Sequence, residues 1–304
     1  MPINTLEFAQ LTQTALDSQV IAEATSGWME LNSSQVKYTG GNEVKIPKLT
    51  MDGLGDYDRD NGFVQGSVTL EWQTRTLTQD RGRTFQLDSM DVDETAFVAT
   101  ASAVMSEFQR TRVIPEIDAY RYSAIATQAA DKGMAETGYT PAPASILSKI
   151  REAAYGIYDI AGEIPLILTM SMPVAAILEA STEIAKYMDT VDFARGEIHT
   201  KVRAIDGIPI MKVPSARMKT KYVFYDGETE DQTVGGFVPD STAKDINWIL
   251  QARDTTIAVS KTDKIRVFEP NTNQKADAWK IDYRKYHDLW ILDNQFDRIR
   301  VCTK

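Results

Sequence analysis

Polar and hydrophobic positions along the first third of the chain follow a helical period and then a strand period. Residues 4–24 place apolar side chains at helical spacing and predict a helix-prone arm, assigned with its linker to residues 1–42. The period then changes to two, which predicts strands at residues 44–49 and 67–77 around a tip dense in Gly and Asp. Together they predict a long two-stranded ribbon within residues 43–88. Because an isolated hairpin is marginally stable in water, we expect this ribbon to lie on another chain.

A long amphipathic helix is predicted after the ribbon. Asp91 and Glu94 are spaced as in a capping box, and apolar side chains then recur on one helix face. Pro115 is expected to kink or restart the helix, because it lacks a backbone donor and crowds the preceding turn. The two parts together cover about 38 residues, which at roughly 1.5 Å each gives about 57 Å. This length predicts an elongated molecule, with residues 89–144 forming the helix and the first part of a peripheral domain.

The second half of the chain changes to an α/β pattern and then returns to strands. We expect an inserted domain over residues 145–255, in which Asp206 and Gly207 form the turn of a strand pair. Residues 256–304 are expected to return to the peripheral domain. The other expected elements of the inserted domain are helices at 145–158 and 174–185, a buried strand at 164–170 and a polar loop at 226–242. The expected final strands are 256–259, 264–268, 278–286, 288–292 and 298–302.

Composition and charge narrow the classes of function. Hydrophobic residues make up 43% of the 304 positions and charged residues 25%, which is ordinary for a globular protein. The net charge is −10, with 33 basic and 43 acidic residues and no basic run, so tight DNA binding is not expected. Such a charge still suits a container that holds DNA without gripping it. No secretory signal or membrane span is predicted, and one cysteine, Cys302, cannot form an internal disulfide.

The sequence offers no convincing catalytic or metal-binding constellation. Asp56, Asp58 and Asp60 are spaced like calcium ligands, but the glycine falls one place late and the last ligand position is Ser67. His199 and His287 lie far apart in strand-like contexts, and Cys302 is expected to be a small packed or edge residue rather than a nucleophile. Tyrosines at positions 120, 122, 155 and 158 are expected to pack within helices. No phosphate-binding or nucleophile motif is present, so we expect no catalytic residue, no metal and no cofactor.

Several short stretches in one order carry a family resemblance. They are GLGDYDR (53–59), DRGRTF (80–85), MDVDET (90–95), FQR (108–110), VIPEID (113–118), DGIPI (206–210), WIL (248–250) and HDLW (287–290). With the order of the expected elements, these stretches resemble the major capsid proteins of tailed double-stranded DNA phages. The resemblance implies the α+β Hong Kong 97-type fold: an N-terminal arm, an extended two-stranded loop, a long spine helix, peripheral strands and an inserted axial α/β domain.

The resemblance also implies a function. It implies a non-enzymatic subunit that self-assembles into pentamers and hexamers around a double-stranded DNA genome, in a virion built in the host bacterial cytoplasm. The expected partners are copies of the chain, either a separate scaffolding protein or none, and a portal protein, with packaged DNA enclosed without tight binding and no membrane. An encapsulin-like nanocompartment shell is the nearest alternative. An α/β enzyme is the alternative of a different class, and it would need a pocket with convergent titratable groups.

Contacts between subunits are expected at two places. Asp56, Asp58 and Arg59 lie at the tip of the ribbon, where we expect them to meet a neighbouring copy. Arg81 and Arg83 flank Gly82 between the ribbon and the helix. Their guanidinium groups suit carboxylates, and two interpretations stay open. They bind acids of their own chain, such as Asp88 and Asp91, or a neighbour's Asp56. Covalent crosslinking is not expected, because the ribbon's lysines, at positions 45 and 48, lie near its base.

Overall fold

The structure is a computed structural model that describes most of the chain. Described are residues 23–38, 43–60, 62–88, 104–181, 188–195, 198–268, 270–273 and 275–304. The expected arm before residue 23 and the capping box at Asp91 and Glu94 lie outside these ranges. No helix in the described ranges has the length and apolar character that a membrane crossing requires.

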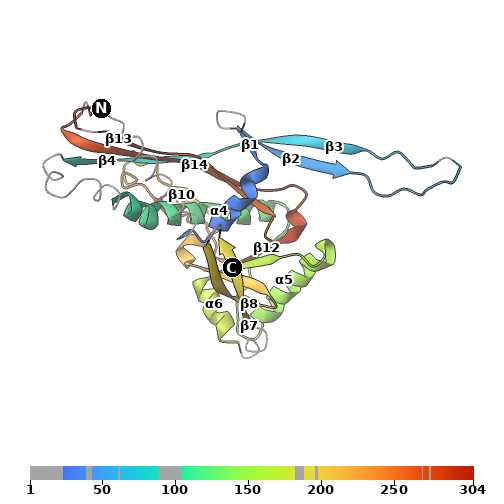
Figure 1. The fold of residues 1–304 in the computed structure, drawn as a ribbon. Coiled ribbons are helices and arrows are strands. Elements are labelled where there is room, and N and C mark those ends of the chain that lie inside the picture. The colour runs from blue at the N-terminus through green and yellow to red at the C-terminus, as the bar shows by residue number, and fades with distance from the viewer. Residues whose placement is uncertain are drawn as a thin grey trace.

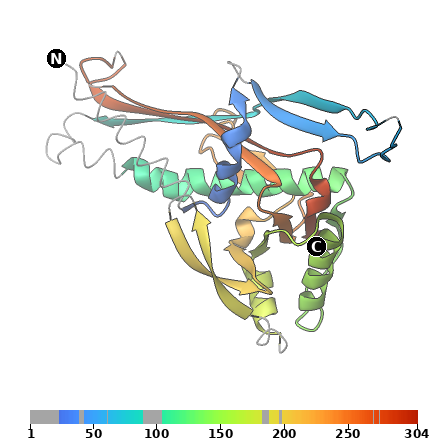
Figure 2. The same cartoon turned by 45° about the vertical axis from the view of Figure 1, so that its right-hand side comes forward.

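The molecule is elongated, as the sequence predicted, and a ribbon projects from one end of it (Figure 1). A long helix runs along its middle, with a flat three-stranded sheet on one side and a compact lobe on the other (Figures 1 and 2). The ribbon consists of β2 (Glu43–Met51) and β3 (Val68–Thr76), paired antiparallel over their whole length. A short strand β1 (Lys37–Tyr38) pairs with the base of β2. The predicted ribbon is therefore confirmed in position and pairing.

The three-stranded sheet contains fewer and longer strands than the sequence predicted. The four strands expected between residues 256 and 292 form only two, β13 (Thr256–Phe268) and β14 (Ala278–Ile291). The expected break near residue 262 is instead a shift of register within β13, between Lys261 and Lys264. The third strand, β4 (Gln79–Asp88), was assigned to the extended loop, and this assignment is wrong. β4 pairs with β14 along its length, because Phe85 and its neighbours pack on the buried face of that sheet.

The helix continues through the proline that was expected to interrupt it. Helical backbone is described from residue 104, with a π-helical segment Gln109–Val113 that leads directly into α4 (Ile114–Asp131). Pro115 lies at the start of α4 and has no N–H to donate to the residue four positions earlier, so the turn before it widens. From residue 104 to Asp131 the spine is thus one helix with a local irregularity.

The lobe is built on a seven-stranded mixed sheet covered on both faces. Its order is β5-β15-β12-β6-β9-β8-β7, and β6 and β12 are buried at every position. Helix α4 covers one face, with Tyr122 and Ile125 in one hydrophobic cluster, while α5 (Ile146–Ala161) and α6 (Met172–Glu179) cover the other. The strands are β5 (Ala135–Glu136), β6 (Leu166–Ser171), β7 (Met188–Arg195), β8 (Ile198–Ile205), β9 (Ile208–Val213), β12 (Ile246–Ala252) and β15 (Ile299–Thr303).

Two details of the lobe differ from the predicted boundaries. Strand β15 was placed with the peripheral strands of residues 256–304, but it pairs with β12 and β5 inside the lobe, since its buried apolar side chains complete that core. The loop expected at 226–242 contains β11 (Phe237–Pro239), which pairs with β10 (Tyr222–Phe224).

Tyr155, which was expected to pack within its helix, is 60% exposed. Short 3-10 turns are η1 (Gly27–Gln35), η4 (Ser215–Arg217) and η5 (Phe296–Arg298).

The closest backbone approach in the peripheral sheet gives a test of the β4–β14 pairing. A Cβ added at Gly82 would lie 2.8 Å from the carbonyl oxygen of Tyr283, whereas one added at Gly156 in α5 would meet nothing within 4 Å. We expect Gly82→Ala to lower the free energy of unfolding by about 1–3 kcal/mol through overpacking. The matched Gly156→Ala should raise it by about 0.5–1 kcal/mol, because alanine favours a helix. Denaturant unfolding of the unassembled chain measures both; equal effects would contradict the pairing.

Candidate assembly surfaces and the buried charge cluster

One face of the ribbon packs against the body at the base of the ribbon. Val44, Ile46 and Leu77 are buried on that face and pack with Ile257 and Val259 of β13. The same face carries Gln73 and Arg75, whose side chains both donate to the carboxylate of Asp293. The base therefore has a fixed orientation, and the rest of the ribbon extends from it.

Beyond the base, the apolar side chains of the ribbon lie on its opposite face. Directly opposite each other across the strands lie Pro47 and Trp72, then Leu49 and Leu70, then Met51 and Val68. We call these six residues the apolar ladder. Leu49, Leu70, Met51 and Val68 are between 50% and 68% exposed, although burial of such side chains is worth about 1.5–3 kcal/mol each. An apolar strip of this kind on a projecting ribbon is typical of an interaction surface.

The tip of the ribbon is closed by local contacts. Asp58 and Gly62 exchange two backbone hydrogen bonds, and the Asp58 carboxylate accepts the N–H of Asp60. Tyr57 packs against Phe63 with ring centroids 4.9 Å apart. The expected contact residues, Asp56, Asp58 and Arg59, are all exposed there. Within the described ranges, no group of three or more His, Cys, Asp or Glu side chains is placed to hold a metal ion.

Arg81 and Arg83 lie on β4 and reach a segment of the lobe. The Arg81 Nε donates to Glu116 of α4 at 2.7 Å, and its two terminal nitrogens donate to the carbonyl oxygens of Tyr225 and Gly236. Glu116 is an acid of the same chain, though not one of those expected. Arg83 donates to the carbonyl of Thr233 and is an exposed residue. Arg81 is therefore engaged within the chain.

A cavity of about 410 Å³ opens beside these arginines, between β4, the spine helix and residues 225–236. Its wall includes Arg81 and Glu116, which pair with each other, and His287. The wall contains no Ser, Thr or Cys among its described residues. Among its described residues the cavity thus offers no serine, threonine or cysteine nucleophile, and the lining residues that carry a hydroxyl group are Tyr225 and Tyr283.

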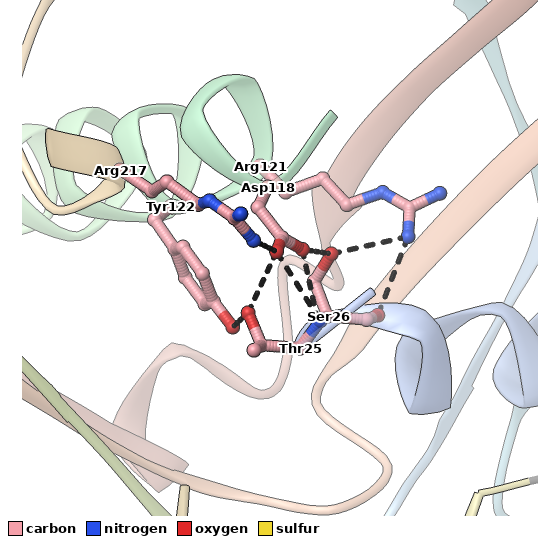
Figure 3. Close-up of polar contacts among 6 residues, drawn as sticks. All are labelled: Thr25, Ser26, Asp118, Arg121, Tyr122 and Arg217. Carbon is pink, nitrogen blue, oxygen red and sulfur yellow. Dashed lines mark hydrogen bonds and ion pairs between the residues drawn. The ribbon is translucent and has the colours of Figure 1, made fainter. Parts of the chain in front are cut away.

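A buried charge cluster joins the N-terminal segment, the spine helix and the lobe (Figure 3). The carboxylate of Asp118 in α4 is fully buried and accepts four hydrogen bonds from the backbone and hydroxyl groups of Thr25 and Ser26, at 2.6 to 3.2 Å. Arg217 of η4 adds an ion pair at 3.1 Å. Tyr122 donates to the hydroxyl of Thr25. One carboxylate therefore links three parts of the molecule.

Arg121, three residues further along the same helix, extends the cluster to the peripheral sheet. Its side chain is fully buried and donates to Ser26 and to the carboxylate of Glu30 in η1. Ser260 of β13 donates to the same carboxylate. Burial raises the pKa of Glu30, but the charges of Arg121 and Lys285 outweigh it and hold that pKa below its usual value. Glu30 is therefore ionised and fixes η1 against both elements.

The histidine and cysteine that the sequence singled out are packed in the interior. His287 is 3% exposed, and burial, with the charges of Arg121, Lys285 and Arg81, holds its pKa well below the usual value. Burial raises the pKa of the Cys302 thiol to about 11, so it is protonated and a poor nucleophile. Asn247 donates to its sulfur at 3.7 Å. The strand-like context of His287 and the packing of Cys302 are confirmed.

The chain is similar to known proteins in structure but not in sequence. No protein-family model matches the chain, and no curated protein is significantly similar in sequence. Among solved structures, the capsid of cyanophage P-SCSP1u superposes with a TM-score of 0.57 at 13% identity, over 88% of this chain and 84% of that one. A Gordonia phage Cozz chain gives 0.53 at 15% identity, over 90% and 86%.

The two superpositions extend over 88% and 90% of the chain. The chain has the Hong Kong 97-type capsid fold. A virus-like particle from Pyrococcus furiosus has the same architecture, with a TM-score of 0.51 at 10% identity over 96% of this chain and 98% of that one. The predicted α+β fold class is thereby confirmed.

Removing the charge of Asp118 tests the role of the buried cluster. In Asp118→Asn an amide group replaces an acceptor that faces the guanidinium of Arg217 and several other donors. We expect a loss of about 3 kcal/mol or more in the free energy of unfolding, as for other broken buried pairs. Asp293→Asn is the matched control in the partly exposed pair with Arg75 and should cost less than about 1 kcal/mol. Comparable losses in denaturant unfolding would contradict the assignment.

Because His287 is buried, we expect the free energy of unfolding to fall on mild acidification. The unfolded chain binds a proton at this residue below its usual pKa of 6.5, whereas the folded chain does not, because its pKa is depressed. The contribution of neutral His287 to the free energy of unfolding is therefore fully present above that pH. Below it, the free energy of unfolding falls by up to about 1.4 kcal/mol per pH unit. Unfolding free energies measured between about pH 7 and pH 5.5 should fall less steeply for His287→Gln. Equal slopes in the two proteins would be incompatible with a neutral His287.

Proposed function

We propose that the chain is the major capsid protein of a tailed double-stranded DNA phage. The observation that carries the proposal is the superposition of nearly the whole chain on phage capsid structures, together with a ribbon whose apolar ladder is exposed in a single copy. Copies of the chain assemble into pentamers and hexamers that enclose the genome. Their role is structural, in keeping with the phage capsids on which the chain superposes.

Within such a shell, the parts of the chain take different positions. The lobe, close to residues 145–255, lines the centre of each capsomer, and the ribbon and N-terminal arm reach neighbouring copies. The spine helix and the three-stranded sheet form the periphery. Asp56, Asp58 and Arg59 are candidate contacts because they are exposed at the tip, and Arg83 because it is an exposed residue on β4. Arg81 remains a weaker candidate, since three acceptors of its own chain already engage it.

The proposed partners follow from the charge and from the shell. A net charge of −10 suits a wall that encloses DNA without binding it tightly, since strong phosphate binding needs clustered cations. A separate scaffolding protein and a portal protein complete the particle, which is built in the cytoplasm of the host bacterium. The particle is the virion capsid.

A nanocompartment shell is the second candidate function, because the virus-like particle from Pyrococcus furiosus covers the largest share of this chain among the similar structures reported above. The phage capsid is preferred, because the cyanophage capsid superposes with the higher TM-score. Genes for a portal and a DNA-packaging motor beside this gene would support the phage shell. A gene for an enclosed enzyme in their place would support the compartment.

The proposal predicts that the purified chain, alone or with a scaffolding protein from the same gene neighbourhood, forms shells, tubes or capsomer rings. Repeated contacts of modest area drive such closed assemblies, so the assembled fraction should rise with concentration. Light scattering with negative-stain imaging measures it. A chain that stays monomeric at every salt and protein concentration, with and without scaffold, would rule the proposal out.

A further inference from the structure

We infer that the apolar ladder lies on a neighbouring copy of this chain in the assembled shell, while the opposite face of the outer ribbon remains in solvent. The ladder consists of Pro47, Leu49, Met51, Val68, Leu70 and Trp72. The inference rests on the proposed function and adds to it which of the two ribbon faces makes the contact, and with which residues.

The register of the ribbon separates its side chains into two faces without ambiguity. Residues directly opposite each other share a face, and every second residue along a strand returns to it. Near the base, Val44 and Ile46 are buried on one face, while Lys45 and Thr74 occupy the other. Beyond Pro47 the arrangement is reversed. The apolar side chains there therefore face away from the surface on which the ribbon's own base is packed.

The polar face of the outer ribbon needs no partner. Lys48 lies directly opposite Glu71, and Thr50 lies directly opposite Thr69. Opposite charges and paired threonines are favourable cross-strand neighbours on an exposed sheet face. A ribbon that floated free would have no reason to keep its other face apolar, since both faces would then meet water. The asymmetry indicates that one face is covered.

The described part of this chain does not cover the ladder. The ribbon projects beyond the body in both views, away from the spine helix and the lobe (Figures 1 and 2). The contact that does reach the ladder is at its base, where the ammonium group of Lys37 lies 4.5 Å from the ring of Trp72. Leu49, Leu70, Met51 and Val68 are each at least half exposed. We assign a second copy because proteins of this fold form capsids and virus-like particles.

Paired cysteine variants on adjacent positions of one strand test the assignment. Leu70→Cys lies on the ladder and Thr69→Cys on the polar face, and the native Cys302 is fully buried, so it contributes little background. Maleimide labelling of the Leu70→Cys variant should slow about ten-fold or more on assembly, and that of the Thr69→Cys variant by less than about two-fold, because only the covered face loses solvent. Equal labelling of the two, or protection of the Thr69→Cys thiol alone, would overturn the inference.

The same experiment identifies the occupant. Protection of the Leu70→Cys thiol in the unassembled chain would mean that the chain covers its own ladder. A thiol that remains reactive in shells of the purified chain would mean that a different protein covers it. Either result overturns the second-copy assignment. Shells that form with the unexpected labelling pattern leave the proposed function intact, whereas an unchanged chain that never assembles overturns both.

Lysine substitutions provide a second measurement that does not depend on labelling. Leu49→Lys places a charge on the ladder, and Thr50→Lys places the same charge one residue away on the polar face. Both sites are exposed in the single copy, so both variants should fold, with unchanged thermal unfolding. We expect the assembled fraction to fall about ten-fold or more for Leu49→Lys and less than about two-fold for Thr50→Lys. Comparable assembly of the two variants would contradict the inference.

Discussion

The arrangement of the whole molecule depends on two buried charges of opposite sign on one turn of the spine helix. Asp118 and Arg121 are both fully buried, and taking such groups out of water costs several kcal/mol each. That cost is recovered when every partner is in place. The partners belong to the N-terminal segment, to η4 of the lobe and, through Glu30, to β13 of the peripheral sheet. Any other docking of these parts would leave a buried charge without its partners.

This requirement fixes geometry more than it adds stability. Apolar side chains pack almost as well in several registers, whereas a carboxylate that needs donors from Thr25, Ser26 and Arg217 accepts one arrangement. In the shell subunit that we propose, a small error in the angle between lobe and sheet would be repeated in every copy. The cluster fixes the spine helix against the N-terminal segment and the lobe, and the ribbon extends from that body on a packed base.

Local patterns in the sequence predicted the ribbon and the helices of the lobe well, since their spacing depends on near neighbours. They could not predict β4, because its partner strand lies far along the chain, with Thr84 and Asp282 separated by 198 positions. Strand β12 was not predicted, because the polar amides Asn247 and Gln251 interrupt the apolar pattern of a strand that is buried on both faces. The buried cluster left a readable signal, a charged pair three residues apart within the apolar face of the helix, and that signal was missed. No pattern in the sequence indicated the partners of Arg81.

The position of β15 has a consequence for how the protein is made. This strand, Ile299–Thr303, lies between β5 and β12, so the lobe's sheet has a gap until residue 303 has been translated. Pairing over such a separation is slow, and the lobe cannot reach its final state while the ribosome still holds that strand. The ribbon, the spine helix and the long peripheral strands are all synthesised before the lobe closes. A nascent chain therefore carries a completed ribbon before the sheet of its lobe is complete.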